Sequence, residues 1–217
     1  MNAFFRVQIL VDNDSWIVPY AQELSILLAQ KGHYSEYIKD HSQVLKGDLL
    51  VLLGCIKKVP SELLSLVDKA IVVHESNLPE GKGFSPLSWQ ILEGKNSIPV
   101  VLLDASEEID GGNTYLKEVL YFGGDELIDE MRDALGKKTI EVMLKFIELY
   151  PNISSIPQEG VSTYYPRRTP KDSELDINRS IKEQFNLFRI ADNEKYPPFF
   201  LYKGHQYTLK IEKRSLA

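Results

Sequence analysis

The chain has 217 residues, of which 43% are hydrophobic and 26% are charged, and its formal net charge is -6. These values are close to average globular usage and argue against a disordered or fibrous chain. The negative charge disfavours a broad nucleic-acid-binding face, which needs clustered Lys and Arg. No apolar run approaches the roughly 18 residues of a membrane helix, and the N-terminus lacks a signal-peptide pattern. We therefore expect a cytoplasmic protein without membrane association.

The first half of the chain predicts an alternation of strands and helices. Helices are expected at residues 16–30, 61–68 and 86–93, and strands at 4–11, 34–38, 49–53, 70–73 and 98–103. Strands separated by helices of this length favour parallel pairing, with ligands bound outside the carboxyl ends of the strands. We therefore expect the functional side chains on the loops that follow the strands.

The second half of the sequence predicts one long helix, followed by a tail of different amino-acid composition. The helical pattern runs from Tyr115 to about Leu149, with an interruption at Gly123-Gly124 and an end before Pro151. The tail predicts a helix over 177–188 and a β-hairpin over 199–211. We expect one catalytic domain over residues 1–160 and a C-terminal extension over 161–217 that packs on it.

Two other kinds of site are not favoured. The single cysteine, Cys55, lies in an apolar run and is interpreted as a buried structural thiol rather than a nucleophile. His33, His41 and His205 have no partners at metal-ligand spacing, so we expect no metal site.

One segment carries a more specific signal. His74 begins the run HESNLPEGKG, which follows a buried strand and leads into the helix start SPLSW, and Asp110 lies later in the run IDGG. This combination resembles the folate-dependent formyltransferases, whose hallmark is HxSxLP, a basic residue and Gly, a Pro-x-x-Trp helix start and a later Asp-x-Gly motif. The sequence around the motif is most similar to the branch that formylates nucleotide-linked amino sugars, which includes pseudaminic acid pathway enzymes. Matches at 53–60 and 165–173 extend the resemblance over most of the chain.

The resemblance implies a fold and a reaction. The fold is an α/β, Rossmann-like formyltransferase fold with a mostly parallel central sheet flanked by helices and a small C-terminal helix and hairpin. The reaction moves a formyl group from 10-formyltetrahydrofolate to the amine of a nucleotide-linked 4-amino sugar. Methionyl-tRNA formyltransferase shares the motif, but 217 residues are fewer than we expect for an enzyme with a separate C-terminal domain. Glycinamide-ribonucleotide formyltransferase has a similar size but does not have a similar tail. A folate- or nucleotide-sugar-binding protein without turnover is a further alternative.

His74 and Asp110 suit the proton transfers of this reaction. Attack of an amine on the formyl carbon gives an oxyanion and a charged nitrogen that must lose a proton before the folate nitrogen leaves. An imidazole near a carboxylate can accept that proton and stay oriented. The alternatives are a structural histidine at a strand end for His74 and a turn residue for Asp110.

One position departs from the family pattern. Formyltransferases commonly carry Asn two residues before the histidine, where its amide holds the formyl oxygen, but Val72 occupies this place and cannot donate. Loss of such a donor typically lowers the rate by about 100- to 1000-fold. Asn77 is our candidate for the catalytic replacement, with Asn113, a backbone N–H group and His74 itself as alternatives.

The resemblance also implies two binding sites in one cleft. The pterin is expected between flat apolar walls and backbone donors and acceptors, formed by Leu53, Gly54, Ile56, Leu78, Pro79, Asp104, Ala105, Ser106 and Ile109. The acceptor is expected near a helix start and a cationic, aromatic tail, on Asp14, Ser15, Trp16, Lys82, Tyr165, Arg167 and Arg168. Ser15 is equally consistent with a helix cap, and the tail with a segment merely anchored to the domain.

Overall fold

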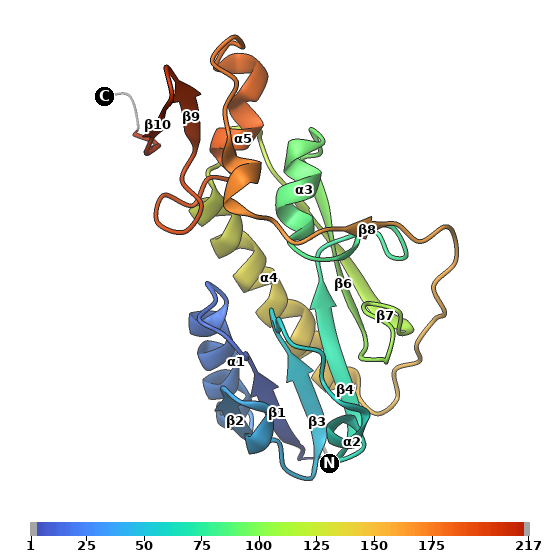
Figure 1. The fold of residues 1–217 in the computed structure, drawn as a ribbon. Coiled ribbons are helices and arrows are strands. Elements are labelled where there is room, and N and C mark those ends of the chain that lie inside the picture. Colours follow the sequence, from blue (N-terminus) through green and yellow to red (C-terminus); the bar gives the residue numbers. More distant parts are fainter. Residues whose placement is uncertain (1–3, 215–217) are drawn as a thin grey trace.

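A computed structural model describes residues 4–214 and contains a six-stranded central sheet (Figure 1). Its order is β2-β1-β3-β4-β6-β7. The strands are β1 (Arg6–Leu10), β2 (Tyr34–Ile38), β3 (Gly47–Leu52), β4 (Val67–His74), β6 (Ser97–Asp104) and β7 (Thr114–Tyr121). The first four pair in parallel, whereas β6 runs antiparallel to both β4 and β7. The expected fold class, a mostly parallel sheet flanked by helices, is confirmed.

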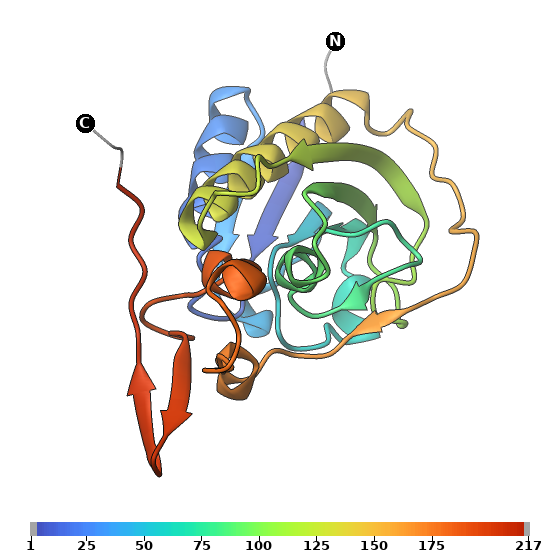
Figure 2. The same ribbon diagram turned by 90° about the horizontal axis from the view of Figure 1, so that it is seen from above.

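Helices cover both faces of the sheet. The larger core packs α1 (Val18–Gln30) and α4 (Ile128–Leu149) against one face. A smaller core lies on the other face beside α2 (Ser61–Leu64). The helix α3 (Pro86–Leu92) follows the β4 loop and packs beside α5 (Phe185–Arg189) in both views (Figures 1 and 2). The 3-10 turns lie at His41–Gln43, Pro170–Ser173 and Lys182–Gln184.

Three expected helices differ from the structure. Residues 114–121 form β7, because the apolar residues of TYLKEVLY complete the sheet beside β6, and this pairing prevails over a pattern that also fits a helix. The helix expected over 61–68 ends at Leu64, since Val67 already pairs with Gly47 in the β3–β4 ladder. The tail helix expected over 177–188 is reduced to a 3-10 turn and α5.

The chain after α4 crosses the molecule before it reaches α5. Residues 151–168 run in extended form around the β6–β7 side and return over the top (Figures 1 and 2). There β8 (Tyr164–Tyr165) pairs in parallel with β5 (Lys82–Gly83), a contact between the tail and the loop after β4. The hairpin β9 (Phe199–Tyr202) and β10 (His205–Thr208) then projects from the body.

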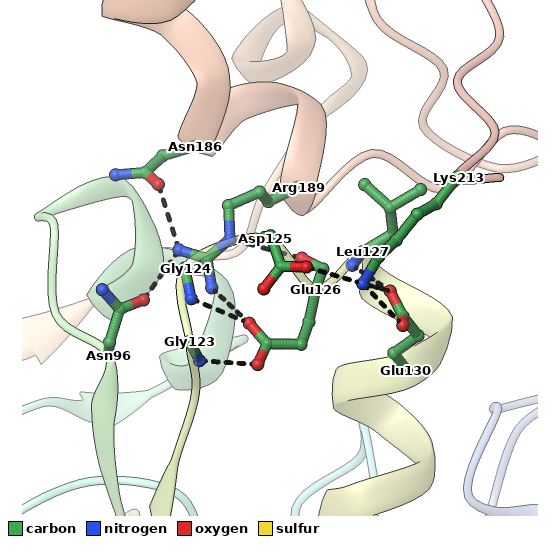
Figure 3. A network of polar contacts seen from close by, with 10 residues as sticks. All are labelled: Asn96, Gly123, Gly124, Asp125, Glu126, Leu127, Glu130, Asn186, Arg189 and Lys213. Carbon is green, nitrogen blue, oxygen red and sulfur yellow. Dashed lines mark hydrogen bonds and ion pairs between the residues drawn. The ribbon is translucent and has the colours of Figure 1, made fainter. Parts of the chain in front are cut away.

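A buried arginine fastens this tail to the sheet (Figure 3). The side chain of Arg189 is only 1% exposed. Its guanidinium donates to the Asn96 side chain at 2.8 Å, to the Asn186 side chain at 3.1 Å and to the Glu126 backbone carbonyl at 3.2 Å. It also forms an ion pair of 3.3 Å with the Glu126 carboxylate. Arg189 thus fixes α5 to the connection between β7 and α4.

Candidate active site

A cleft of about 1040 Å³ opens at the carboxyl ends of β1, β3 and β4. It is lined by residues 13–19, 52–59, 72–75 and 83–88. Residues of the loop 104–110, of α4 and of the segment from 167 to 196 complete the lining. Its volume lies near the upper end of the range for small-molecule sites.

His74 and Asp110 meet in this cleft. His74 is the last residue of β4 and is 5% exposed. Its Nδ1 lies 3.5 Å from the Asp110 Oδ2, and its Nε2 lies 2.8 Å from the Gly81 carbonyl oxygen. The same Asp110 oxygen accepts a 2.8 Å hydrogen bond from the Gly83 backbone N–H. Both ring nitrogens therefore face oxygen acceptors, and only a ring that has gained a proton can donate to both.

The approach of Asp110 depends on a loop that folds back over the sheet. Because β6 is antiparallel to β4, its last residue pairs with Ile71, well before His74, so the two strands do not share a carboxyl edge. Gly112 allows the return, since a Cβ there would lie 1.9 Å from the Asp104 carbonyl oxygen. Gln158 donates to the carbonyls of Asp110 and Gly112 at 2.7 and 2.8 Å and holds the loop. We expected His74 and Asp110 to meet because their loops follow neighbouring strands at the same edge of the sheet. Instead, Gly112 and the tail residue Gln158 hold Asp110 close to His74.

Most residues expected to bind the pterin line the cleft. They are Leu53, Gly54, Ile56, Asp104, Ala105, Ser106 and Ile109. Leu78 and Pro79 do not line it. Pro79 packs against the returning tail, where its carbonyl accepts from the Thr163 N–H at 3.3 Å and its ring lies near Gly160. These two residues shape the His74 loop from behind instead.

Most of the residues expected to bind the acceptor also line the cleft. They are Asp14, Ser15, Trp16, Arg167 and Arg168. The Ser15 side chain makes no cap hydrogen bond to α1. Four further lining residues had not been singled out, because packing of α4 and the tail rather than any motif places them there: Arg132, Asp192, Lys195 and Tyr196.

Lys82 and Tyr165, which we expected to bind the acceptor, do not line the cleft. The Lys82 side chain is 5% exposed and its Nζ pairs with Glu108 at 2.7 Å. Tyr165 stacks on Trp89 and donates its hydroxyl to Glu93 at 2.8 Å. Both residues belong to the β5–β8 contact that joins the tail to the His74 loop.

The replacement donor expected at Asn77 is not supported by the geometry. Asn77 is exposed, accepts a hydrogen bond from Lys117 and does not line the cleft. Asn113 is also exposed and donates to Ser155 at 3.4 Å. Val72 does line the cleft, so the position of the family amide is apolar in this chain.

Cys55 lines the cleft but is poorly suited to nucleophilic chemistry. Its thiol donates to the Leu10 carbonyl at 3.4 Å, and burial raises its pKa to about 12. At pH 8 only about one thiol in ten thousand is then ionised. We expect iodoacetamide to label the folded protein far more slowly than the protein in urea, as measured by mass spectrometry. Equal labelling rates in the two states would contradict this.

Within residues 4–214, no three His, Cys, Asp or Glu side chains gather as a metal site requires. None of the helices described there is long and apolar enough to cross a membrane.

Several known proteins share this fold. The methionyl-tRNA formyltransferase from Clostridium thermocellum superimposes with a TM-score of 0.81 at 20% identity, covering 96% of this chain and 93% of that one. A sugar N-formyltransferase from Shewanella sp FDAARGOS_354 has a TM-score of 0.74 at 15% identity, covering 97% and 98%. HypX from Aquifex aeolicus in complex with tetrahydrofolic acid has a TM-score of 0.80 at 18% identity, covering 96% of this chain and 38% of that one.

Sequence relatives point in the same direction. A methionyl-tRNA formyltransferase from Sulfurihydrogenibium sp. (strain YO3AOP1) is 28% identical over 71% of this chain and 53% of its own length. The one from Alkaliphilus oremlandii (strain OhILAs) is 32% identical over 67% of this chain and 48% of its own length. The chain thus spans about half the length of these relatives. The "Formyl transferase" family model matches residues 11–147, and the chain therefore belongs to the formyl transferase family.

Proposed function

We propose that this protein transfers a formyl group from 10-formyltetrahydrofolate to the amino group of a nucleotide-linked 4-amino sugar in surface-glycan biosynthesis. A UDP-linked precursor of pseudaminic acid is one such acceptor. The family, the paired His74 and Asp110 and the HypX complex with tetrahydrofolic acid support the donor half of this proposal. The arginines and the lysine that the tail and α4 contribute to the cleft lining support the acceptor half.

Arg168 is the observation that carries the choice of acceptor. It is 8% exposed and lines the cleft, yet its Nε has no hydrogen-bond partner within the described part of the chain. Its Nη2 makes only long contacts of 3.3 Å, to the Asp172 carbonyl and the Ser173 hydroxyl. A buried guanidinium with a free donor suits an anionic ligand group such as a diphosphate.

Other charges and rings around Arg168 fit the same ligand. Arg132 lies 6.0 Å from the Trp16 ring centroid and pairs with Asp192 at 2.8 Å. Lys195 donates to the Asp14 carbonyl at 2.7 Å. An aromatic ring beside cations is a common binding site for a nucleotide, because the base can stack on the ring and the cations can pair with the phosphates.

In the proposed reaction, the acceptor amine attacks the formyl carbon within the cleft, beside His74. His74 takes a proton from the attacking nitrogen and passes it to the folate nitrogen as the carbon–nitrogen bond of the donor breaks. Asp110 and the Gly81 carbonyl stabilise the charged ring in the interval. The 3.5 Å contact is long for a hydrogen bond, as is common before ligands bind.

Tetrahydrofolate release tests this proposal directly. The protein is mixed with 10-formyltetrahydrofolate and, in separate reactions, UDP- or dTDP-linked 4-amino sugars and charged initiator methionyl-tRNA. The tRNA arm is included because the curated relatives are methionyl-tRNA formyltransferases. Turnover with an amino sugar supports the proposal. Turnover with tRNA alone, or ligand binding without turnover, contradicts it.

We expect Arg168→Gln to raise the KM for the nucleotide-linked acceptor by about tenfold or more, with a smaller change in kcat. The loss of one charge-assisted hydrogen bond to a phosphate accounts for this size. The KM for the folate donor should stay unchanged, because Arg168 is not among the residues that we expect to bind the pterin. Arg179→Gln is the matched control, since Arg179 is exposed and outside the cleft. An unchanged acceptor KM would remove Arg168 from the acceptor site.

A further inference from the structure

Glu75 is a carboxylic acid in the cleft to which the reaction described above gives no role. It follows His74 directly, lines the cleft and is partly buried. Its backbone carbonyl accepts a 2.5 Å hydrogen bond from the buried Gln90 of α3, which fixes this point of the chain. The backbone of Glu75 is therefore fixed by the end of β4 before it and by the hydrogen bond from Gln90 to its own carbonyl.

Glu75 lies just beyond the end of β4. His74 is the last residue of that strand, and Glu75 follows it in a bend that lines the cleft. Leu135 and Thr139 of α4 line the same cleft. Glu75 is therefore adjacent to the proposed proton-transfer histidine and borders the space that the ligands would occupy.

The carboxyl group of Glu75 lacks a permanent positive partner. Within residues 4–214 no Lys or Arg forms an ion pair with it. Burial raises its pKa, His74 lowers it, and the neighbouring Asp110 carboxylate raises it further. Arg132 is the cation of α4 that lines the cleft, and it is held by Asp192. A desolvated carboxylate without a cation is costly unless a ligand supplies the charge.

We propose that Glu75 binds the protonated amine of the acceptor and removes the proton that blocks its attack. This inference rests on the proposed formyl transfer and assigns Glu75 as a catalytic residue of that reaction. Primary amines are largely protonated at pH 7 and must lose a proton before they become nucleophiles. A carboxylate whose pKa is raised by burial is a more effective base than an ordinary one.

The protons of the complete reaction then balance. The ammonium gives its first proton to Glu75, and the free amine forms a bond to the formyl carbon while the carbonyl electron pair moves to oxygen. The second proton passes through His74 to the folate nitrogen as the pair returns and the old carbon–nitrogen bond breaks. The products are the formamide and tetrahydrofolate, and Glu75 releases its proton to water.

The pH dependence of Glu75→Gln tests this role. At pH 7 we expect kcat/KM for the amino sugar to fall by roughly 100-fold, the usual size for loss of a general base. The defect should shrink as the pH rises toward the pKa of the acceptor amine, because the amine then arrives without the extra proton. A structural defect would be similar at every pH. Glu80→Gln, in the same loop but exposed, is the matched control and should behave as wild type.

Binding provides a second readout that does not require turnover. Isothermal titration at pH 7 compares a UDP-linked 4-amino sugar with its N-acetylated form, which has no positive charge. We expect the wild type to prefer the amine and Glu75→Gln to lose this preference, with tetrahydrofolate affinity unchanged. Equal affinities in the wild type, binding of neither sugar, or a Glu75→Gln defect independent of pH would overturn the role of Glu75. Inactivity of the wild type on every amino sugar, with the amine preference intact, would instead count against the proposed transfer.

Discussion

We expect His74→Asn to lose turnover by at least about a thousandfold while its tetrahydrofolate affinity changes by less than about threefold. The asparagine Nδ2 occupies the place of the histidine Nδ1 and can still donate to Asp110, so this contact is retained. It cannot carry a proton between the attacking and leaving nitrogens. The measurements are tetrahydrofolate release for the rate and fluorescence titration for the affinity.

His205→Asn is the control for this substitution. His205 lies in the projecting hairpin, is exposed and should tolerate the change without loss of rate. Wild-type turnover by the His74 variant would remove this imidazole from the mechanism. Loss of folate affinity parallel to the loss of rate would show that His74 acts through binding instead.

We expect Arg189→Met to lower the free energy of unfolding by about 3 kcal/mol. The guanidinium is 1% exposed, and its removal leaves the Glu126 carboxylate without its cation. The side-chain oxygens of Asn96 and Asn186 lose a donor as well. Urea unfolding followed by circular dichroism measures the change, and the midpoint should fall while the slope is retained.

Arg179→Met is the comparison for this prediction. Arg179 is exposed and makes one 3.3 Å contact to a backbone carbonyl, so the cost should stay within about 0.5 kcal/mol. If both variants unfold at the same urea concentration as wild type, the network around Arg189 does not stabilise the tail.

The sequence predicts the parallel part of the sheet well, because β1, β3 and β4 contain apolar runs bounded by clear loop signals, and β2 follows the helix-ending Lys31-Gly32. It fails at β7, where TYLKEVLY fits a helix and a strand equally and only the free edge of β6 decides between them. The error matters for the site. An antiparallel β6 changes how Asp110 reaches His74, although the motif correctly picked out both residues as neighbours.

The cleft residues divide in the same way. Residues next to the motif in a strand-end loop were accessible to sequence reasoning, as His74, Asp110 and Asp104 illustrate. Arg132 and Asp192 were not, since their meeting depends on how α4 packs against the tail. Lys82 and Tyr165 were predicted to bind the acceptor because of their residue types and their nearness to the motif. In the structure they hold the tail against the His74 loop and do not line the cleft.

Because the chain returns over the top of the sheet, the cleft is lined by residues from two separate stretches of sequence. The part matched by the family model, residues 11–147, contains the imidazole, the carboxylate and the proposed pterin wall. Arg167, Arg168 and Lys195 come from beyond it. Under the proposed function, we expect substitutions of these three residues to change the preference for the amine without altering the His74–Asp110 pair, although Asp14, Trp16 and Arg132 also contribute to the cleft from within the matched part.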